Sequence, residues 1–292
     1  MLRVGIILAG GTLSFKTIIA TGSTALLYIL FSMTLTFIVA YFMGKMIKVS
    51  GKTSVLVGGG TAVCGATAIA TLSAAIDARE DETAYAMTAI FLFDIIAALS
   101  WPYVAAALQY SPEQFGLLAG VAINDVASVT AAGETFDKLM GVAAANASGT
   151  SGGELSMIVK LTRVALLVVV AVIATVVHRG QAKRRGNEFE KQVFSLKKSI
   201  ISAFPFYILG FLLLAVCNTV LDFSSVAIFG TTLSAVLRMT YRYFITVALV
   251  GVGCKIRLTE LFTKGAKPVL LGGCTWAAVS ICALVYTFVF MS

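Results

Sequence analysis

The chain has 292 residues, of which 59% are apolar (AVILMFWYC) and only 12% are charged, and its formal net charge is +8. An ordinary soluble domain is roughly 45–50% apolar and about 25% charged, so a soluble fold could not bury this excess of apolar surface. The composition also excludes disordered chains, collagen and disulfide-rich secreted scaffolds. The sequence therefore predicts an all-α, polytopic membrane helix bundle.

Nine apolar segments follow one another along the chain, and about 20 apolar residues are enough to cross a bilayer as a helix. The predicted segments are 4–15, 24–44, 53–76, 83–109, 115–133, 155–177, 199–221, 224–253 and 268–292. The first is short for a span, and the eighth is longer than one straight span requires. We expect them to form a single transmembrane transporter domain over residues 1–292, with membrane lipids around it.

Lys and Arg residues gather in alternate loops. Most of them lie in three loops, at 45–52, 179–198 and 255–267, whereas the opposite side carries few. Cytoplasmic loops carry the excess of basic residues, so we expect these three loops, including the basic loop 179–198, to be cytoplasmic. The N-terminus is then cytoplasmic and the C-terminus extracytoplasmic. Because the positive charge belongs to these loops, it does not indicate a nucleic-acid partner.

The third segment contains four glycines within eight residues, Gly58-Gly59-Gly60 and Gly65. Each Gly costs a helix interior up to about 1 kcal/mol relative to Ala. One interpretation is a discontinuous helix, whose unwound link must be buried in protein or line a cavity. The second half-helix would direct its backbone N–H groups at an anion. The alternative is that the glycines only allow close helix packing. The candidate substrate-binding residues here are Gly60, Thr61, Cys64, Gly65 and Ala66, with the N–H groups of the last three as donors.

The fifth segment is interrupted by Asn124-Asp125. A carboxylate at membrane depth is costly and normally faces a bundle interior or an aqueous path. On a continuous helix Asn124 and Ser128 share a face, and Thr130 joins them only where the helix is broken. We expect Asn124, Ser128 and Thr130 to help bind the substrate, and Asp125 to carry a proton or help hold Na⁺. The alternative role for Asp125 is a structural ion pair with a cation of the next segment.

That next segment carries Lys160 and Arg163, which share a helix face. Their side chains either snorkel to the membrane surface or present positive charge to an anion path. Asp94 is a further intramembrane carboxylate to which the sequence assigns no partner. Arg238 and Arg242 lie one turn apart, and three interpretations are open: their side chains snorkel to the membrane surface, they mark a kink in the helix, or they reach a water-filled vestibule.

Several signatures are absent from the sequence. It contains no GxxxxGK[ST] phosphate loop, no HExxH or GxSxG motif and no TVGYG-type filter. The five cysteines and the single histidine show no metal-ligand spacing. We therefore expect no enzymatic activity, no metal site and no cofactor apart from H⁺ or Na⁺ as a coupling ion.

The chain resembles the YeiH-like sulfate exporter family of bacterial membrane proteins. The residues that carry the resemblance are the 2–8 stretch, the 60–66 Cys-Gly motif, the 126–133 Ala-Ala-Gly segment, Lys160 with Arg163, and 265–268. Members resemble bile-acid and arsenite carriers, which implies inverted repeats, two discontinuous helices and a bacterial inner-membrane location. The inverted-repeat reading fits a weak similarity between 10–15 and 253–258, in segments that cross in opposite directions; chance is the alternative.

Two departures from the family pattern matter. Members carry a His-Glu pair where this chain has Asn124-Asp125, so a histidine-dependent proton step is in doubt. Members also have two further helices before the 2–8 stretch, so we expect a short form, a misassigned start or a truncation.

Taken together, the sequence predicts a secondary transporter for a small anion (sulfate, sulfite or an organosulfonate) coupled to H⁺ or Na⁺. The alternatives are an uncoupled anion channel or uniporter, and a non-transporting membrane scaffold. Substrate identity, direction of transport and oligomeric state, including a homo-oligomer, stay open.

Overall fold

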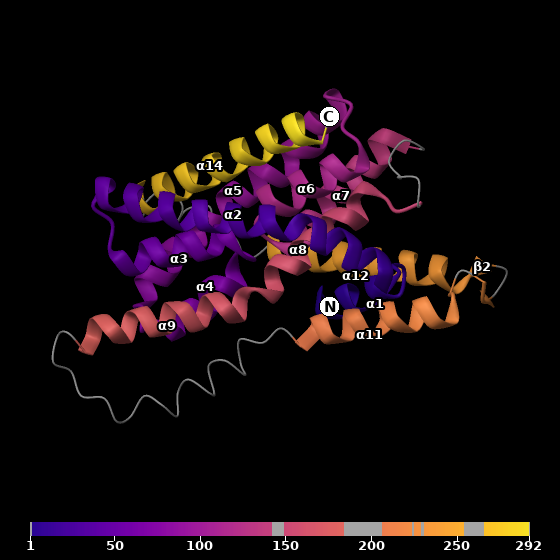
Figure 1. The fold of residues 1–292 in the computed structure, drawn as a ribbon, viewed down its shortest axis with the longest axis horizontal. Helices are drawn as coiled ribbons and strands as arrows, with labels where there is room; N and C mark the ends of the chain where they lie inside the picture. The colour runs from indigo at the N-terminus through magenta and orange to yellow at the C-terminus, as the bar shows by residue number, and fades with distance from the viewer. Residues whose placement is uncertain are drawn as a thin grey trace.

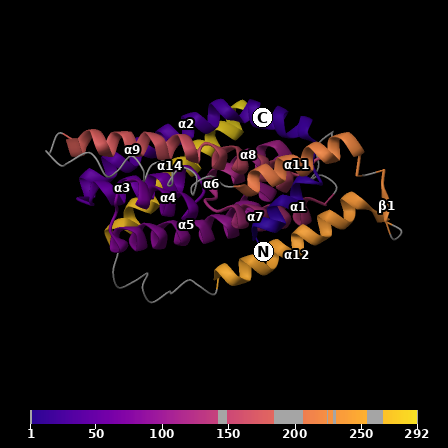
Figure 2. The same ribbon diagram turned by 90° about the horizontal axis from the view of Figure 1, so that it is seen from below.

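The computed structural model describes residues 2–141, 149–183, 206–223, 225–228, 231–253 and 266–291. These residues form an elongated bundle of helices that run side by side (Figures 1 and 2). The strands form an antiparallel hairpin in which Ala227 pairs with Thr232 and Ile228 with Thr231. In chain order the elements are α1 (Leu2–Gly10), α2 (Phe15–Ile47), α3 (Gly51–Ala62), α4 (Ala66–Ala75), α5 (Glu80–Ala107), α6 (Pro112–Ala122), α7 (Val126–Met140), α8 (Gly152–Ala165), α9 (Leu167–Lys183), α11 (Phe206–Leu221), β1 (Ala227–Ile228), β2 (Thr231–Thr232), α12 (Leu233–Gly253) and α14 (Ala266–Phe290).

Side-chain caps determine where several helices begin. The Ser14 hydroxyl accepts a hydrogen bond from the Thr17 backbone N–H (3.1 Å) at the start of α2. At the start of α6, Ser111 and Gln114 form a reciprocal capping box, and Pro112 occupies the first helical position. These caps satisfy backbone N–H groups that have no partner inside their own helix, so α2 and α6 begin sharply after short connections.

Four helical stretches in the described residues are long and apolar enough to cross a bilayer. They are Phe15–Ile47, Glu80–Ala107, Gly152–His178 and Ala266–Phe290. Each coincides with one of the predicted segments. The prediction of an all-α fold is therefore confirmed, with four helical stretches that could span a membrane by length and composition.

Two boundaries of the nine predicted segments are wrong. The sequence places Lys16 in a loop between the first two segments, but α2 is continuous from Phe15 and includes it. The eighth segment, 224–253, begins with the hairpin and becomes helical only at Leu233. Lys16 is exposed, so its charge costs little in a helix and gives no signal of a helix end.

The predicted basic loop at 179–198 also begins too early, because α9 continues to Lys183. Residues 184–198 lie outside the described residues. The same is true of 199–205 at the start of the seventh predicted segment, in which α11 begins at Phe206.

Small residues allow α8 to pack closely against α6 and α7 near the middle of the bundle (Figure 1). A Cβ atom added to Gly116 of α6 would lie 2.6 Å from the Leu155 Cβ, and one added to Gly120 would lie 2.7 Å from the Val159 Cβ. No real carbon atom approaches so closely, so α6 and α8 can be this near only with glycine at these positions.

The variant Gly120→Ala is therefore expected to lower the free energy of unfolding by about 1–3 kcal/mol, because the added methyl overpacks a close helix contact. Gly51→Ala is the matched control, since a Cβ at Gly51 meets no atom within 4 Å. Thermal unfolding of the detergent-solubilised protein measures both. Equal stability of the two variants would contradict the packing argument.

Candidate functional site

Two of the predicted segments, 53–76 and 115–133, each contain a three-residue link between two helices, and the two links lie next to each other. Residues 63–65 separate α3 from α4, and residues 123–125 separate α6 from α7. A Cβ added to Gly65 would lie 3.7 Å from the Asn124 carbonyl oxygen. Gly65 has φ +66°, ψ −123°, a conformation that suits glycine because it has no Cβ. We call residues 63–65 and 123–125 the paired links.

Arg163 of α8 joins the C-terminal ends of the two helices that precede the paired links. Its Nε donates to the Ala62 carbonyl (2.9 Å), and its Nη2 donates to the carbonyls of Thr61 (2.8 Å) and Ala62 (2.5 Å). Its Nη1 donates to the carbonyls of Gly120 (3.2 Å) and Val121 (2.5 Å). The guanidinium is fully buried. It satisfies carbonyl groups that the ends of α3 and α6 leave without a helical partner.

Two further side chains complete the C-terminal end of α6. Lys160 Nζ donates to the Ile123 carbonyl (2.6 Å), and Trp276 Nε1 of α14 donates to the Ala122 carbonyl (3.1 Å). Lys160 is fully buried, as Arg163 is. Cations at the negative ends of two helix dipoles are electrostatically favourable, and this location explains why α8 can bury both charges.

Asp94 of α5 holds the beginning of α7. Its Oδ1 accepts hydrogen bonds from the backbone N–H groups of Asn124 (2.7 Å) and Asp125 (2.8 Å). Its Oδ2 accepts from the Ser128 hydroxyl (2.5 Å). Asp94 is 2% exposed, and its carboxylate has two donors from the link and one from α7. These partners of Asp94 could not be assigned from the sequence, because they lie 30 to 34 residues away along the chain. The signal in the sequence was a charge within an apolar segment.

Asp125 is the N-cap of α7. Its carboxylate accepts from the Ala127 backbone N–H (2.8 Å), and its side chain is half-buried, as is that of Ser128. Asn124 beside it is 1% exposed. The Asn124 Nδ2 points to the Ile90 carbonyl (3.5 Å), whereas its Oδ1 is buried and has no hydrogen-bond partner within the described part of the chain.

The beginning of α4 is partly exposed. The first N–H that bonds within this helix is that of Ile69, to the Gly65 carbonyl (3.1 Å). The N–H groups of Ala66, Thr67 and Ala68 precede it and have no acceptor in their own helix. Ala66 is half-buried and Thr67 is exposed. The predicted donor set is wrong in one member, because the Gly65 N–H donates to Gly60 (2.9 Å). Sequence reasoning missed Thr67.

The other predicted substrate-binding residues are buried in packing contacts. Thr61 Oγ1 lies 3.3 Å from Thr275 Oγ1, and the Thr130 hydroxyl donates to the Val126 carbonyl (2.9 Å). A Cβ on Gly60 would meet Ile90 and Ile69 side-chain atoms at 2.9–3.0 Å. Cys64 is 1% exposed. The structure therefore brings Gly60, Thr61, Cys64 and Thr130 close to the paired links without exposing their side chains.

The structure differs from three expectations about the polar side chains of these segments. Lys160 and Arg163 do not snorkel, because their charged groups bind buried backbone carbonyls. In the described residues no nitrogen of either lies within 4.0 Å of the Asp125 carboxylate, so the considered ion pair is not formed. Asn124 and Ser128 do not share a helix face, because Asn124 lies in the link; the Asp94 carboxylate connects them instead.

Arg238 of α12 has a specific partner rather than a free path to the membrane surface. Its Nη2 lies 3.0 Å from Glu154 Oε1 at the start of α8. The Arg242 side chain lies outside the described residues. Arg238 therefore ties α12 to α8, the helix that carries Lys160 and Arg163.

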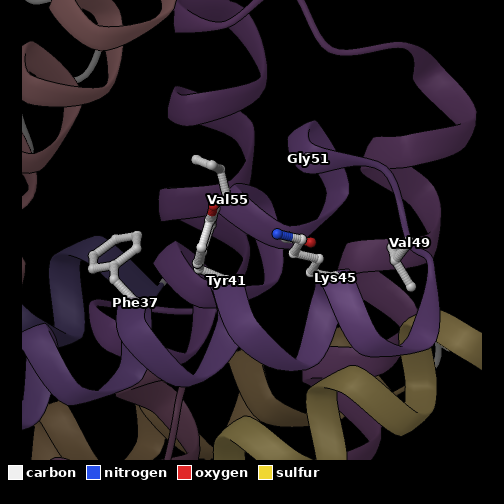
Figure 3. Close-up of a pocket in the computed structure, with 7 residues that line it drawn as sticks. Phe37, Tyr41, Lys45, Val49, Gly51 and Val55 are labelled. Atoms are coloured by element: carbon white, nitrogen blue, oxygen red, sulfur yellow. The ribbon is translucent and has the colours of Figure 1, made fainter.

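A separate cavity of about 260 Å³ lies away from the paired links, between α2 and α3 (Figure 3). Phe37, Tyr41 and Lys45 line it from α2, and the lining is completed by Val49, Gly51, Ser54 and Val55.

The sequence pattern of one family, Conserved hypothetical protein 698, matches residues 1–272. This chain belongs to that family. It is 33% identical over 292 residues to a UPF0324 membrane protein of Fusobacterium nucleatum, covering 97% of this chain and 80% of the relative. A UPF0324 membrane protein of Streptococcus agalactiae is 31% identical over 97% of this chain and 78% of its own length. Another, from Clostridium tetani, is 32% identical over 93% and 75%.

No solved structure matches the chain. The relatives are named as membrane proteins, which agrees with the apolar helices of the bundle.

Proposed function

We propose that this chain is a secondary transporter that moves a small anion, of the sulfate, sulfite or organosulfonate class, across the bacterial inner membrane. The observation that carries the proposal is a difference between the helix ends at the paired links: the C-terminal carbonyls are bound by cations, and the N-terminal N–H groups of α4 are not bound within their helix. Buried cations bind the C-terminal ends of α3 and α6, whereas at the N-terminal end of α4 the N–H groups of Ala66 and Thr67 have no acceptor in their own helix and are partly exposed, and Asp125 of the other link is half-buried. A helix N-terminus favours an anion.

In this proposal each pair, α3 with α4 and α6 with α7, is one discontinuous membrane helix. Unwound backbone at membrane depth needs buried partners or a water-filled cavity, and the contacts of Arg163, Lys160 and Asp94 supply the partners. The proposal includes nine membrane segments arranged as inverted repeats, with the N-terminus in the cytoplasm. The anion binds at the N–H groups of Ala66 and Thr67, and Ser128, whose hydroxyl donates to Asp94, positions the start of α7.

Asp125 couples transport to H⁺ or Na⁺ in this proposal, because it is the half-exposed carboxylate at the paired links. The Asn124 Oδ1 beside it, which has no hydrogen-bond partner among the described residues, supports a cation, since a buried oxygen acceptor repels an anion and attracts Na⁺ or a proton donor. Lys160 and Arg163 bind carbonyls, so we assign them a structural role and only a long-range attraction for the anion.

Flux of sulfate and sulfite into proteoliposomes under imposed pH or Na⁺ gradients tests the function. Asp125→Asn keeps the shape of the side chain and removes its charge, so we expect gradient-driven flux to fall at least tenfold. Glu113→Gln is the matched control, because Glu113 is an exposed carboxylate at the start of α6 and should leave flux unchanged. Flux with unchanged pH and Na⁺ dependence in Asp125→Asn would overturn the coupling role.

Two alternatives give different results in the same assay. An uncoupled channel or uniporter gives flux that follows voltage and ignores imposed H⁺ and Na⁺ gradients. A membrane scaffold gives no flux of any anion from folded, monodisperse protein. The half-buried Asp125 argues against a scaffold, which has no need of a costly carboxylate that pairs with no cation of the described residues.

A further inference from the structure

We infer that the cavity between α2 and α3 is a binding site for one anionic phospholipid, with an acyl chain against its apolar wall and the headgroup phosphate on Lys45. This site is distinct from the paired links and does not depend on the transport proposal. The inference rests on three observations: the lining of the cavity, the free cation at its end and the apolar outer surface of α2.

The lining changes from apolar to basic along one helix face. Phe37, Tyr41 and Lys45 are spaced four residues apart on α2, and Val55 of α3 faces them (Figure 3). Aromatic rings with a polar end are typical of the level of lipid headgroups, and Tyr41 is one turn from Lys45. A soluble anion such as phosphate has no part that fits Phe37 and Val55, whereas a phospholipid has both an apolar chain and an anionic group.

The Lys45 ammonium is available for a ligand. In the described part of the chain it has no ion pair and no hydrogen-bond partner, and its side chain is exposed. Two charges near this end of the bundle are already engaged. Lys52 Nζ donates to the Asp77 carbonyl (2.5 Å), and the Glu82 carboxylate accepts from the Ser50 hydroxyl (2.5 Å). Lys45 therefore meets a headgroup without first breaking a contact inside the protein.

The outer surface of α2 beside the cavity is apolar. Tyr41 is 63% exposed, Phe42 61% and Met46 73%. Large exposed apolar side chains on a membrane helix face acyl chains, so lipid has direct access to this cavity. Lys48 follows at the end of α2 and adds a second positive charge near the headgroup.

Two variants remove different parts of the site. Lys45→Gln removes the charge and is expected to weaken binding of phosphatidylglycerol about fivefold, the equivalent of one basic residue near a membrane surface. Gly51→Trp fills the cavity: Gly51 lines it, and a Cβ there meets no atom within 4 Å, so the variant is expected to fold. Lys16→Gln is the control, because Lys16 is an exposed lysine at the other end of α2.

The experiment is a titration of the purified, full chain in detergent with phosphatidylglycerol or phosphatidylcholine of identical acyl chains, followed by native mass spectrometry and thermal shift. We expect one tightly bound phosphatidylglycerol per chain in the wild type and in Lys16→Gln, and weaker binding in both Lys45→Gln and Gly51→Trp. Equal binding of the two lipids would overturn the inference. So would phosphatidylglycerol binding unchanged in both site variants, or an equal thermal shift with inorganic phosphate alone.

Discussion

Arg163→Met is expected to lower the free energy of unfolding by about 3–5 kcal/mol, the range for removing one partner of a buried charged network. Methionine fills a comparable volume but donates no hydrogen bond. The carbonyls of Thr61, Ala62, Gly120 and Val121 would lose the guanidinium donors that now reach them. Each buried acceptor left without a partner costs about 1–3 kcal/mol.

The variant Arg163→Lys separates the effect of the positive charge at position 163 from the effect of the hydrogen-bonding geometry of the guanidinium. One ammonium group restores the positive charge at the helix ends but cannot reach carbonyls of both α3 and α6 as the planar guanidinium does, so its stability should lie between those of wild type and Arg163→Met. Arg79→Gln is the control, because Arg79 pairs with Asp81 on the surface and its loss should cause no measurable change. Chemical unfolding in mild detergent measures all three. If Arg163→Met matches Arg79→Gln, Arg163 does not hold the paired links.

Asp94→Asn is expected to cost about 2–3 kcal/mol and to abolish coupled flux. The amide keeps one oxygen but presents an NH₂ group where donors now converge, so either the two backbone N–H groups of the second link or the Ser128 hydroxyl loses its acceptor. Hydrogen bonds to a charged group are worth about 1.5–3 kcal/mol each. Since Asn124 and Asp125 are fixed by Asp94, the geometry of the proposed coupling site changes with it.

Glu113→Gln is again the appropriate control, because it makes the same carboxylate-to-amide change at an exposed position. Unfolding is measured in detergent and flux in proteoliposomes, on the same preparations. Ser128→Ala tests the hydroxyl alone and should lose less stability than Asp94→Asn, because two of the three donors to Asp94 remain. An Asp94→Asn protein as stable and as active as Glu113→Gln would contradict the positioning role.

Physical constraints of composition made the membrane class predictable from the sequence. With 59% apolar and 12% charged residues, the chain has more apolar surface than a soluble fold can bury, and a bilayer can cover it. Runs of apolar residues in the sequence located the four long apolar helices. The two interruptions of helix were also visible as local features: three glycines before one link and Gly65 within it, and Asn124-Asp125 in the other. Gly65 adopts a positive φ that suits glycine, and Asp125 is an N-cap, so both are residues whose local chemistry favours a helix boundary.

The partners of the charged residues could be decided only by the tertiary structure. Lys160 and Arg163 carry the same spacing whether they snorkel, attract an anion or bind carbonyls, because helical periodicity gives a face and not a neighbour. Arg163 meets Thr61 and Ala62 across about one hundred residues, and Asp94 meets the Asn124 and Asp125 backbone across about thirty. Such contacts depend on how α3, α5, α6 and α8 pack around one another. The sequence by itself determined the class of protein and the positions of the paired links. The packing of the helices decided which charged side chains bind the backbone at these links and which residues there remain partly exposed.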